Sequence, residues 1–260
     1  MTDAKRALKR GGGVLGAVKE IGIILVGALV ASTLLRMFLL QVFVIPSGSM
    51  ENTMLIGDRV AVQKVSGFQR GDIVVFKDDL GWLRSTTKPP QQWWQSGLTF
   101  VGLLPDESQN YLIKRVIGTP GDHISCCDSA GRLVVNGVAL EESEYLFKDA
   151  SGKQVQPSEM VFDIVVPQGK IFVMGDHRNA SSDSRCHLDA TYNGVAGASA
   201  FVSQSSVVGQ AVATVFPFSR IGGHPRPATF AGVPAATGTA PASPVINGQP
   251  EQRMRVGCGS

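Results

Sequence analysis

The feature that most constrains this chain is an apolar run of 25 residues, Ile21 to Ile45, whose only charged residue is Arg36. A helix of that length, at about 1.5 Å per residue, exceeds the roughly 30 Å of hydrocarbon in a bilayer. A cleaved signal peptide has a shorter apolar region, about 7–15 residues, followed by small residues at its cleavage site. Here Ala31-Ser32-Thr33 lies inside the run. We therefore predict a retained transmembrane anchor over residues 21–45 rather than a signal peptide or a buried core helix.

The formal net charge of +3 is concentrated at the N-terminus. Residues 1–20 contain two acidic residues, Asp3 and Glu20, and five basic ones: Lys5, Arg6, Lys9, Arg10 and Lys19. The rest of the chain balances at 19 basic and 19 acidic residues, which argues against a nucleic-acid-binding surface. Because cations beside an anchor stay in the cytoplasm, we expect a single-pass protein of the cell membrane, with residues 1–20 cytoplasmic and residues 46–225 outside the cytoplasm.

Beyond Pro46 the chain carries short alternating runs and turn signals typical of β-strands. Its 43% hydrophobic and 17% charged residues provide a core and exclude disorder throughout. Asn136-Gly137 predicts a hairpin turn, and further turns are expected at Gly57-Asp58, Gly71-Asp72, Gly121-Asp122 and Gly175-Asp176. We predict a mainly β domain of coiled, mostly antiparallel sheets, with strands within residues 59–65, 72–76, 111–118, 132–140, 162–166, 170–176 and 206–216.

Two segments depart from this pattern. Residues 77–109 contain Lys88-Pro89-Pro90 and all three tryptophans, Trp82, Trp93 and Trp94, which predicts an inserted loop or ribbon. Its indoles either pack on the domain or contact the bilayer interface. Residues 226–260 are rich in Ala, Gly, Pro, Ser and Thr, and we predict a disordered tail there.

A candidate nucleophile follows the predicted anchor directly. In Ile45-Pro46-Ser47-Gly48-Ser49-Met50, small residues flank Ser49 on an apolar background. Such a turn exposes a hydroxyl and directs backbone N–H groups at an incoming carbonyl, as acyl transfer requires. Ser-Gly-Ser is also common in ordinary loops, so this segment alone does not define a site.

A candidate base lies in the strand predicted over residues 111–118. Alternation places Lys114 on one face with Leu112 and Val116. A lysine on that apolar face loses its hydration, which lowers its pKa, and only the uncharged amine can accept a proton from a serine. The alternative is an ordinary ion pair with an acidic partner.

A third cluster spans residues 174–185, Met-Gly-Asp-His-Arg-Asn-Ala-Ser-Ser-Asp-Ser-Arg. Its short polar side chains can fix a neighbouring amine and build a rigid turn, although a plain surface loop has the same composition.

These three segments, in this order behind an N-terminal apolar run, resemble the bacterial type I signal peptidases, or leader peptidases. That family consists of membrane-bound Ser/Lys endopeptidases that remove signal peptides from exported preproteins. The similarity reaches about Phe218 and includes residues 57–64 and 70–76. It implies a serine endopeptidase without a cofactor or metal that cleaves after Ala-x-Ala-like sites, with Ser49 as nucleophile and Lys114 as general base. The implied partners are signal peptides of secreted preproteins and the lipid bilayer, and the protein would act as a monomer.

The resemblance also implies supporting roles. The backbone N–H of Ser49 and the hydroxyl of Ser47 would form the oxyanion hole, Ser181 would orient the Lys114 amine, and Asp183 would pair with Arg185 to brace the loop. The walls of a shallow pocket for small side chains would be Ile45, Pro46, Met50, Met54 and Ile113. This chain departs from the family's usual pattern at Asn52, Met54 and residues 177–180, where His-Arg-Asn-Ala replaces Asn-Arg-Asp-Asn. None of these changes removes an implied catalytic group.

The four cysteines, Cys126, Cys127, Cys186 and Cys258, contain no Cys-x-x-Cys pair, so no metal site is predicted. An oxidising exterior favours a disulfide. Since the family brings the lysine strand close to the Ser-Ser-Asp loop, the resemblance implies that Cys186 pairs with Cys126 or Cys127.

Three other functions can be stated. A Ser-His-Asp triad using His177 with Asp176 or Asp183 rests on residue types alone. A self-cleaving Ser/Lys repressor would carry a DNA-binding region where this chain has its apolar run. A catalytically silent, membrane-tethered β domain that binds peptides would not depend on Ser49.

Overall fold

The computed structural model describes residues 11–83, 110–248 and 258, without the side chains of residues 11–15 and 33–38. The chain divides into two compact units. Of the described residues, the first unit contains 11–40 and the second contains 41–83, 110–248 and 258.

The first unit is helix α2 (Gly11–Phe38). Its described side chains, residues 16–32, are all exposed, and most are apolar. Within the described ranges, no helix meets the combined length and apolarity of a membrane span.

The end of the predicted anchor is wrong, because residues 40–44 form strand β1 (Leu40–Val44). Its side chains alternate between exposed and half-buried, and valines at alternate positions favour a strand over a helix. Pro46 follows directly, where a helix could not continue undisturbed.

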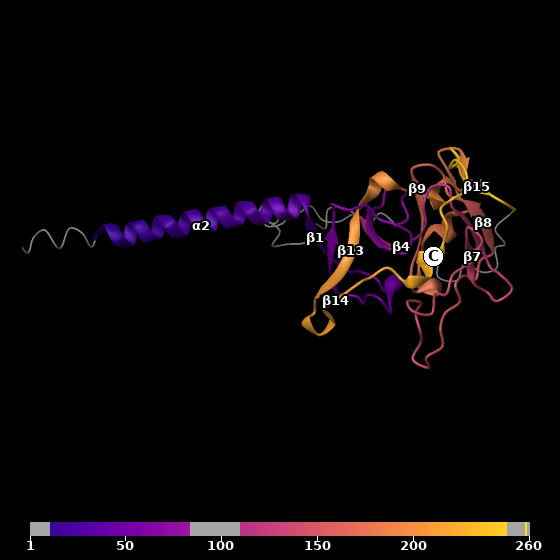
Figure 1. Ribbon diagram of the computed structural model, residues 1–260, viewed down its shortest axis with the longest axis horizontal. Helices are drawn as coiled ribbons and strands as arrows, with labels where there is room; N and C mark the ends of the chain where they lie inside the picture. The colour runs from indigo at the N-terminus through magenta and orange to yellow at the C-terminus, as the bar shows by residue number, and fades with distance from the viewer. Residues whose placement is uncertain (1–10, 84–109, 249–257, 259–260) are drawn as a thin grey trace, which may run out of the picture. The chain divides into compact units, whose positions relative to one another are not determined.

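The second unit is mainly β and antiparallel, as predicted (Figure 1). In the described residues the larger sheet has the order β1-β2-β13-β3-β4-β9-β12, and β14 pairs with β13. These strands are β2 (Arg59–Gln63), β3 (Ile73–Lys77), β4 (Tyr111–Gly118), β9 (Lys170–Met174), β12 (Val202–Ser203), β13 (Val207–Phe216) and β14 (Gly222–Gly223).

The smaller sheet has the order β15-β8-β5-β6-β7. Its strands are β5 (His123–Cys126), β6 (Leu133–Val135), β7 (Val138–Ala139), β8 (Phe162–Val165) and β15 (Val245–Ile246). Asn136 and Gly137 both have positive φ, 50° and 81°, and Val135 faces Val138. The predicted tight hairpin is therefore confirmed.

Short elements complete the unit. A two-stranded ribbon pairs β10 (Thr191–Tyr192) with β11 (Val195–Ala196). The 3-10 turns are η1 (Gly48–Met50), η2 (Arg178–Ala180), η3 (Ser184–His187), η4 (Ala198–Ala200), η5 (Gln204–Ser206), η6 (Phe218–Arg220) and η7 (Ala228–Gly232).

Three of the predicted Gly-Asp turns share one arrangement. Gly57, Gly71 and Gly121 have φ near +88°, +87° and +87°, a conformation that favours glycine. Each following aspartate accepts a hydrogen bond from the backbone N–H three residues before it. Each also pairs with an arginine distant in the sequence: Asp58 with Arg220, Asp72 with Arg226 and Asp122 with Arg70. The turns are thus tied to other parts of the domain.

The predicted disordered tail is wrong for residues 226–248. They include η7 and β15, and β15 pairs with β8. Phe230 is 4% exposed and lies against Gly71, where an added Cβ would be 2.6 Å from the phenyl ring. A few apolar side chains among many small residues therefore suffice to order the segment. Residues 249–257 and 259–260 lie outside the described part.

Most of the predicted insertion, residues 84–109 with Trp93 and Trp94, also lies outside the described residues. Trp82 packs within the domain. Its ring stacks on His187 with centroids 4.6 Å apart, and its Nε1 donates to the Ser199 carbonyl at 2.8 Å. An indole held in this way has its polar N–H satisfied inside the protein.

Candidate active site

Ser49 lies in η1, the turn that joins β1 to β2. The residue is 6% exposed, and the next one, Met50, is fully buried. Backbone hydrogen bonds from Glu51 to Gly48 and from Met54 to Met50 close the turn. The backbone N–H of His177 donates to the Ser49 carbonyl at 3.1 Å. The nucleophile predicted from the sequence is therefore on a rigid turn rather than a free loop.

Lys114 lies in the middle of β4, which pairs with β3 on one side and β9 on the other. The residue is 2% exposed. A hydrogen bond of 2.7 Å joins its Nζ to Ser49 Oγ, and Nζ also donates to the Ile113 carbonyl at 3.1 Å. The structure thus brings together two residues that are 65 positions apart.

Burial lowers the pKa of Lys114 to about 8. The negative charges of Asp183 and Asp176 act in the opposite direction, and the positive charge of Arg185 lowers the pKa further. A substantial fraction of the amine is therefore uncharged near pH 8, which is the form that can accept a proton.

Asp183 and Arg185 form a buried pair beside the lysine. Arg185 Nε and Nη2 donate to the two carboxylate oxygens at 2.9 and 2.8 Å. Burial alone would raise the pKa of Asp183. The contacts with Arg185 and with the Gly175 N–H nevertheless hold this pKa below its usual value. The aspartate therefore stays ionised, and it fixes both ends of the loop of residues 175–185.

Ser181 is 1% exposed. Within the described residues its Oγ makes no well-aligned hydrogen bond, although it lies close enough to Asp183 to help lower that pKa. The hydrogen bonds of Lys114 Nζ in the same region go to Ser49 and Ile113 rather than to Ser181. Ser47 Oγ lies 3.4 Å from Ser49 Oγ, a long contact.

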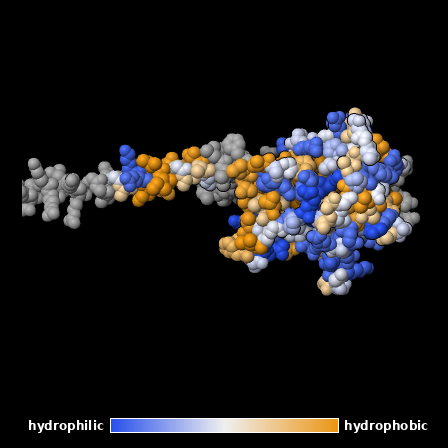
Figure 2. Space-filling model, in the orientation of Figure 1, coloured by the Kyte–Doolittle hydropathy of each residue, from blue (hydrophilic) through white to orange (hydrophobic). Residues whose placement is uncertain are grey.

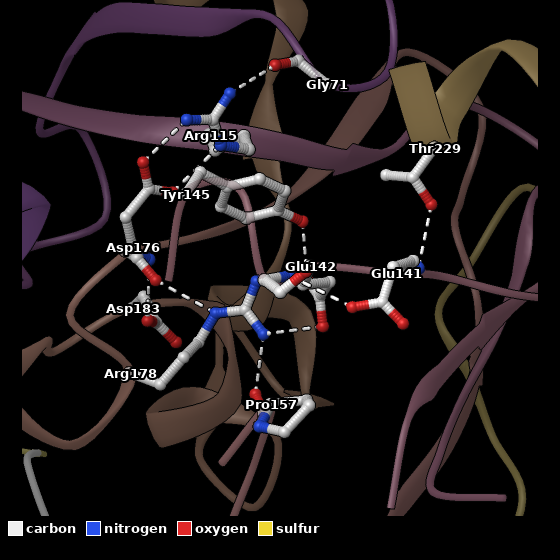
Figure 3. Close-up of polar contacts among 12 residues, drawn as sticks. Gly71, Arg115, Glu141, Glu142, Tyr145, Pro157, Asp176, Arg178, Asp183 and Thr229 are labelled. Carbon is white, nitrogen blue, oxygen red and sulfur yellow. Dashed lines mark hydrogen bonds and ion pairs between the residues drawn. The ribbon is translucent and has the colours of Figure 1, made fainter. Parts of the chain in front are cut away.

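A second buried charge pair, which the sequence did not reveal, is linked to the segment that follows Ser49. Arg115 donates to both oxygens of Asp176 at 2.8 and 2.6 Å and to the Gly71 carbonyl at 2.7 Å (Figure 3). Thr53 Oγ1, four residues after Ser49, donates to the same carboxylate at 2.5 Å. Asp176 thus connects the nucleophile's loop to the strand that carries Lys114.

The network extends through Tyr145, whose ring lies between two guanidinium groups (Figure 3). The guanidinium carbons of Arg115 and Arg178 lie 4.2 and 6.0 Å from the ring centroid. The Tyr145 hydroxyl donates a hydrogen bond to the carboxylate of Glu142, which also accepts one from Arg178. Arg178 further donates to the Gly175 and Pro157 carbonyls. Arg115, Glu142 and Arg178 come from separate parts of the sequence, so the sequence alone did not indicate that they form one network.

The predicted pocket walls are mostly core residues. Ile45, Met50, Met54 and Ile113 are at most 6% exposed and belong to one apolar cluster, whereas Pro46 is exposed. Met50 belongs both to this cluster and to η1, so the cluster anchors the turn that carries Ser49.

The disulfides differ from the prediction. Cys126 is joined to its neighbour Cys127, and Cys186 is joined to Cys258. The C-terminal segment is therefore attached to η3, the turn that contains Arg185. In the described residues, no cluster of three or more His, Cys, Asp or Glu could hold a metal ion.

The ring of His177 contacts Glu51 and the Gly48 carbonyl, and the contact of this residue with Ser49 is made by its backbone N–H. This geometry does not fit a triad in which the imidazole takes the serine proton.

The fold and the site define a mainly β protein with a buried serine–lysine contact. The family described as signal peptidase, peptidase S26, matches residues 18–216. A probable signal peptidase I of Mycobacterium leprae is 34% identical over 237 residues, 80% of this chain and 79% of the relative. Signal peptidase I of Mycobacterium tuberculosis is 33% identical over 85% of this chain and 78% of the relative.

A solved structure of a signal peptidase I from Enterococcus faecalis aligns with 56% of this chain and 97% of its own length, at 24% identity and a TM-score of 0.28. On the sequence matches, this chain belongs to the S26 family of signal peptidases.

Proposed function

We propose that this type I signal peptidase cleaves peptide bonds with Ser49 as nucleophile and Lys114 as general base. The 2.7 Å contact between Lys114 Nζ and Ser49 Oγ is the observation that carries the proposal. The near absence of solvent around the lysine supports an uncharged amine, and the family membership supports the reaction.

The reaction runs in two halves. Neutral Lys114 takes the Ser49 proton as Oγ attacks the scissile carbonyl, and the lysine then gives this proton to the leaving amine. Water attacks the acyl-enzyme and loses a proton to Lys114, which returns it to Ser49 Oγ as the new carboxyl group leaves.

Membership of the family supports further roles for neighbouring residues. The Ser49 N–H and the Ser47 hydroxyl would stabilise the oxyanion, an effect worth about 3–4 kcal/mol per donor in related reactions. Ser181, buried within the loop of residues 175–185, would hold the Lys114 amine in line. Pro46, which is exposed, would line a pocket for small side chains, and Ile45, Met50, Met54 and Ile113 would shape this pocket from within the core.

The substrate would be the signal peptide of an exported preprotein, cut after an Ala-x-Ala-like site at the outer surface of the membrane. The basic residues 1–20 would keep the N-terminus in the cytoplasm. Two apolar surfaces support membrane attachment. The side chains of residues 16–32 of α2 are exposed, and apolar surface of this extent is unfavourable in water. Hydrophobic side chains also gather at the β13–β14 end of the second unit (Figure 2), where Phe218 is 80% exposed and Ile221 is 60% exposed.

The test compares Ser49→Ala and Lys114→Ala with the unmodified full chain in detergent, with a purified preprotein as substrate. Each variant should lose cleavage while it keeps the thermal unfolding midpoint within a few degrees. Full cleavage by either variant would exclude the proposed pair, and cleavage by neither the unmodified chain nor the variants would favour a silent peptide-binding domain. Protease digestion of intact cells tests the topology, because residues 46–225 should be accessible only from outside the cytoplasm.

A further inference from the structure

His177 contacts the turn that carries Ser49 through both its backbone and its ring. Its backbone N–H donates to the Ser49 carbonyl at 3.1 Å. Its ring nitrogen Nδ1 lies 2.9 Å from Glu51 Oε2 and 3.3 Å from the Gly48 carbonyl. One residue therefore contacts Gly48, Ser49 and Glu51, the residue that follows η1.

The imidazole is fixed in place by its surroundings. It stacks on the ring of Phe147, with centroids 3.8 Å apart and planes 20° from parallel. Phe147 is itself held, since its backbone N–H donates to the Asp176 carbonyl at 3.1 Å. The side chain of His177 is 15% exposed and that of Glu51 is 31% exposed. A stacked, mostly buried ring has little freedom to rotate away from its acceptors.

The hydrogen-bonding pattern assigns the ring proton. The Gly48 carbonyl and the Glu51 carboxylate can only accept, so Nδ1 must carry the hydrogen.

Glu51 completes the contact from the other side. Its carboxylate lies so close to Gly48 that a Cβ added to that glycine would be 2.8 Å from Oε1. The carboxylate thus packs against the turn that carries Ser49, while its other oxygen meets His177.

We propose that His177 and Glu51 are positioning residues, a clamp that keeps Ser49 Oγ within reach of Lys114 Nζ. This inference rests on the proposed role of Ser49. Misplacement of a reacting atom by about 1 Å can cost roughly a hundredfold in rate, without a comparable effect on binding. The clamp should therefore affect kcat much more than KM.

The test measures kcat and KM for a preprotein with His177→Ala, Glu51→Ala, Glu51→Gln and the double alanine variant. His177→Ala and Glu51→Ala should each lower kcat about tenfold and change KM less than about twofold. Glu51→Gln retains an acceptor oxygen and should stay within about twofold of the unmodified chain. Since His177 and Glu51 act as a unit, the kcat of the double variant should be no lower than that of the less active single variant.

His123 offers a matched control, because its Nε2 pairs with Asp163 at 2.8 Å in the smaller sheet. His123→Ala should leave kcat unchanged. The pH midpoint of activity should be the same in all variants, since the clamp does not touch Lys114. Unchanged kcat in His177→Ala, equal losses in Glu51→Gln and Glu51→Ala, or a shifted pH midpoint would each overturn the clamp. Activity in Ser49→Ala, measured alongside, would instead overturn the proposed function.

Discussion

At the scale of single residues, the proposed mechanism depends on an amine that burial keeps partly uncharged. Burial lowers the pKa of Lys114 to about 8, although the negative charges of Asp183 and Asp176 raise it. The protonated form cannot accept the Ser49 proton, so kcat/KM should rise with pH and reach half of its plateau near pH 8. A free lysine would give a midpoint near 10.4. Preprotein cleavage between pH 6 and 10 measures this midpoint, and a midpoint near 10 would show that the lysine is not buried in the active enzyme.

A substitution at Arg185 provides a separate test of the pKa of Lys114. Arg185 lowers the pKa of Lys114 and neutralises Asp183. Arg185→Gln should therefore move the activity midpoint to higher pH, because the nearby negative charges are no longer balanced. It should also destabilise the fold by about 3–5 kcal/mol, the usual cost of leaving a buried charge unpaired. Arg132→Gln, which breaks an exposed pair with Asp128, is the control and should leave the midpoint unchanged. A downward shift in Arg185→Gln would contradict this electrostatic account.

At the scale of elements, the site depends on how closely the loop after β9 approaches η1. A Cβ added to Gly175 would lie 2.3 Å from Ser181 Oγ and 2.5 Å from the Ser49 carbonyl. Gly175→Ala should therefore displace the nucleophile's turn and lower kcat at least tenfold. Gly67→Ala, at a loop position with open space around it, should leave kcat unchanged. Equal activity of the two variants would mean that the approach is not needed for catalysis.

Local patterns predicted the elements that depend on local chemistry. The alternation in residues 111–118 and the Asn136-Gly137 turn both led to the observed strands, because neighbouring residues determine a strand's faces and a tight turn. The end of α2 and the order in residues 226–248 were missed. For residues 40–44 the alternate valines and Pro46 were local signals for a strand, but the length of the apolar run outweighed them in the prediction. For residues 226–248 the outcome depends on distant partners, Gly71 against Phe230 and β8 beside β15.

The same distinction holds within the candidate site. Ser49 and Lys114 were candidates because of their local settings, a small-residue turn and an apolar strand face, and the order of the three segments, which resembles the family, assigned their roles. Arg115, Glu142, Tyr145 and Arg178 did not, since their roles come from contacts across the fold.

At the scale of the whole molecule, the Cys186–Cys258 disulfide links the C-terminal segment to the loop that surrounds the site. The two cysteines are 72 residues apart. A cross-link that closes a loop of this length stabilises a fold by roughly 4 kcal/mol, mainly because it restricts the unfolded chain. Cys258→Ser should lower the free energy of unfolding by about that amount, measured by denaturant unfolding of the full chain in detergent.

The bridge between Cys126 and Cys127 provides the matched control, because adjacent residues enclose almost no chain. Replacing both by serine should change the free energy of unfolding far less than Cys258→Ser does. A reductant should destabilise the unmodified protein to the level of Cys258→Ser and affect that variant little. If Cys258→Ser were as stable as the unmodified chain under oxidising conditions, the C-terminal segment would have to be held by its packing in η7 and β15 alone.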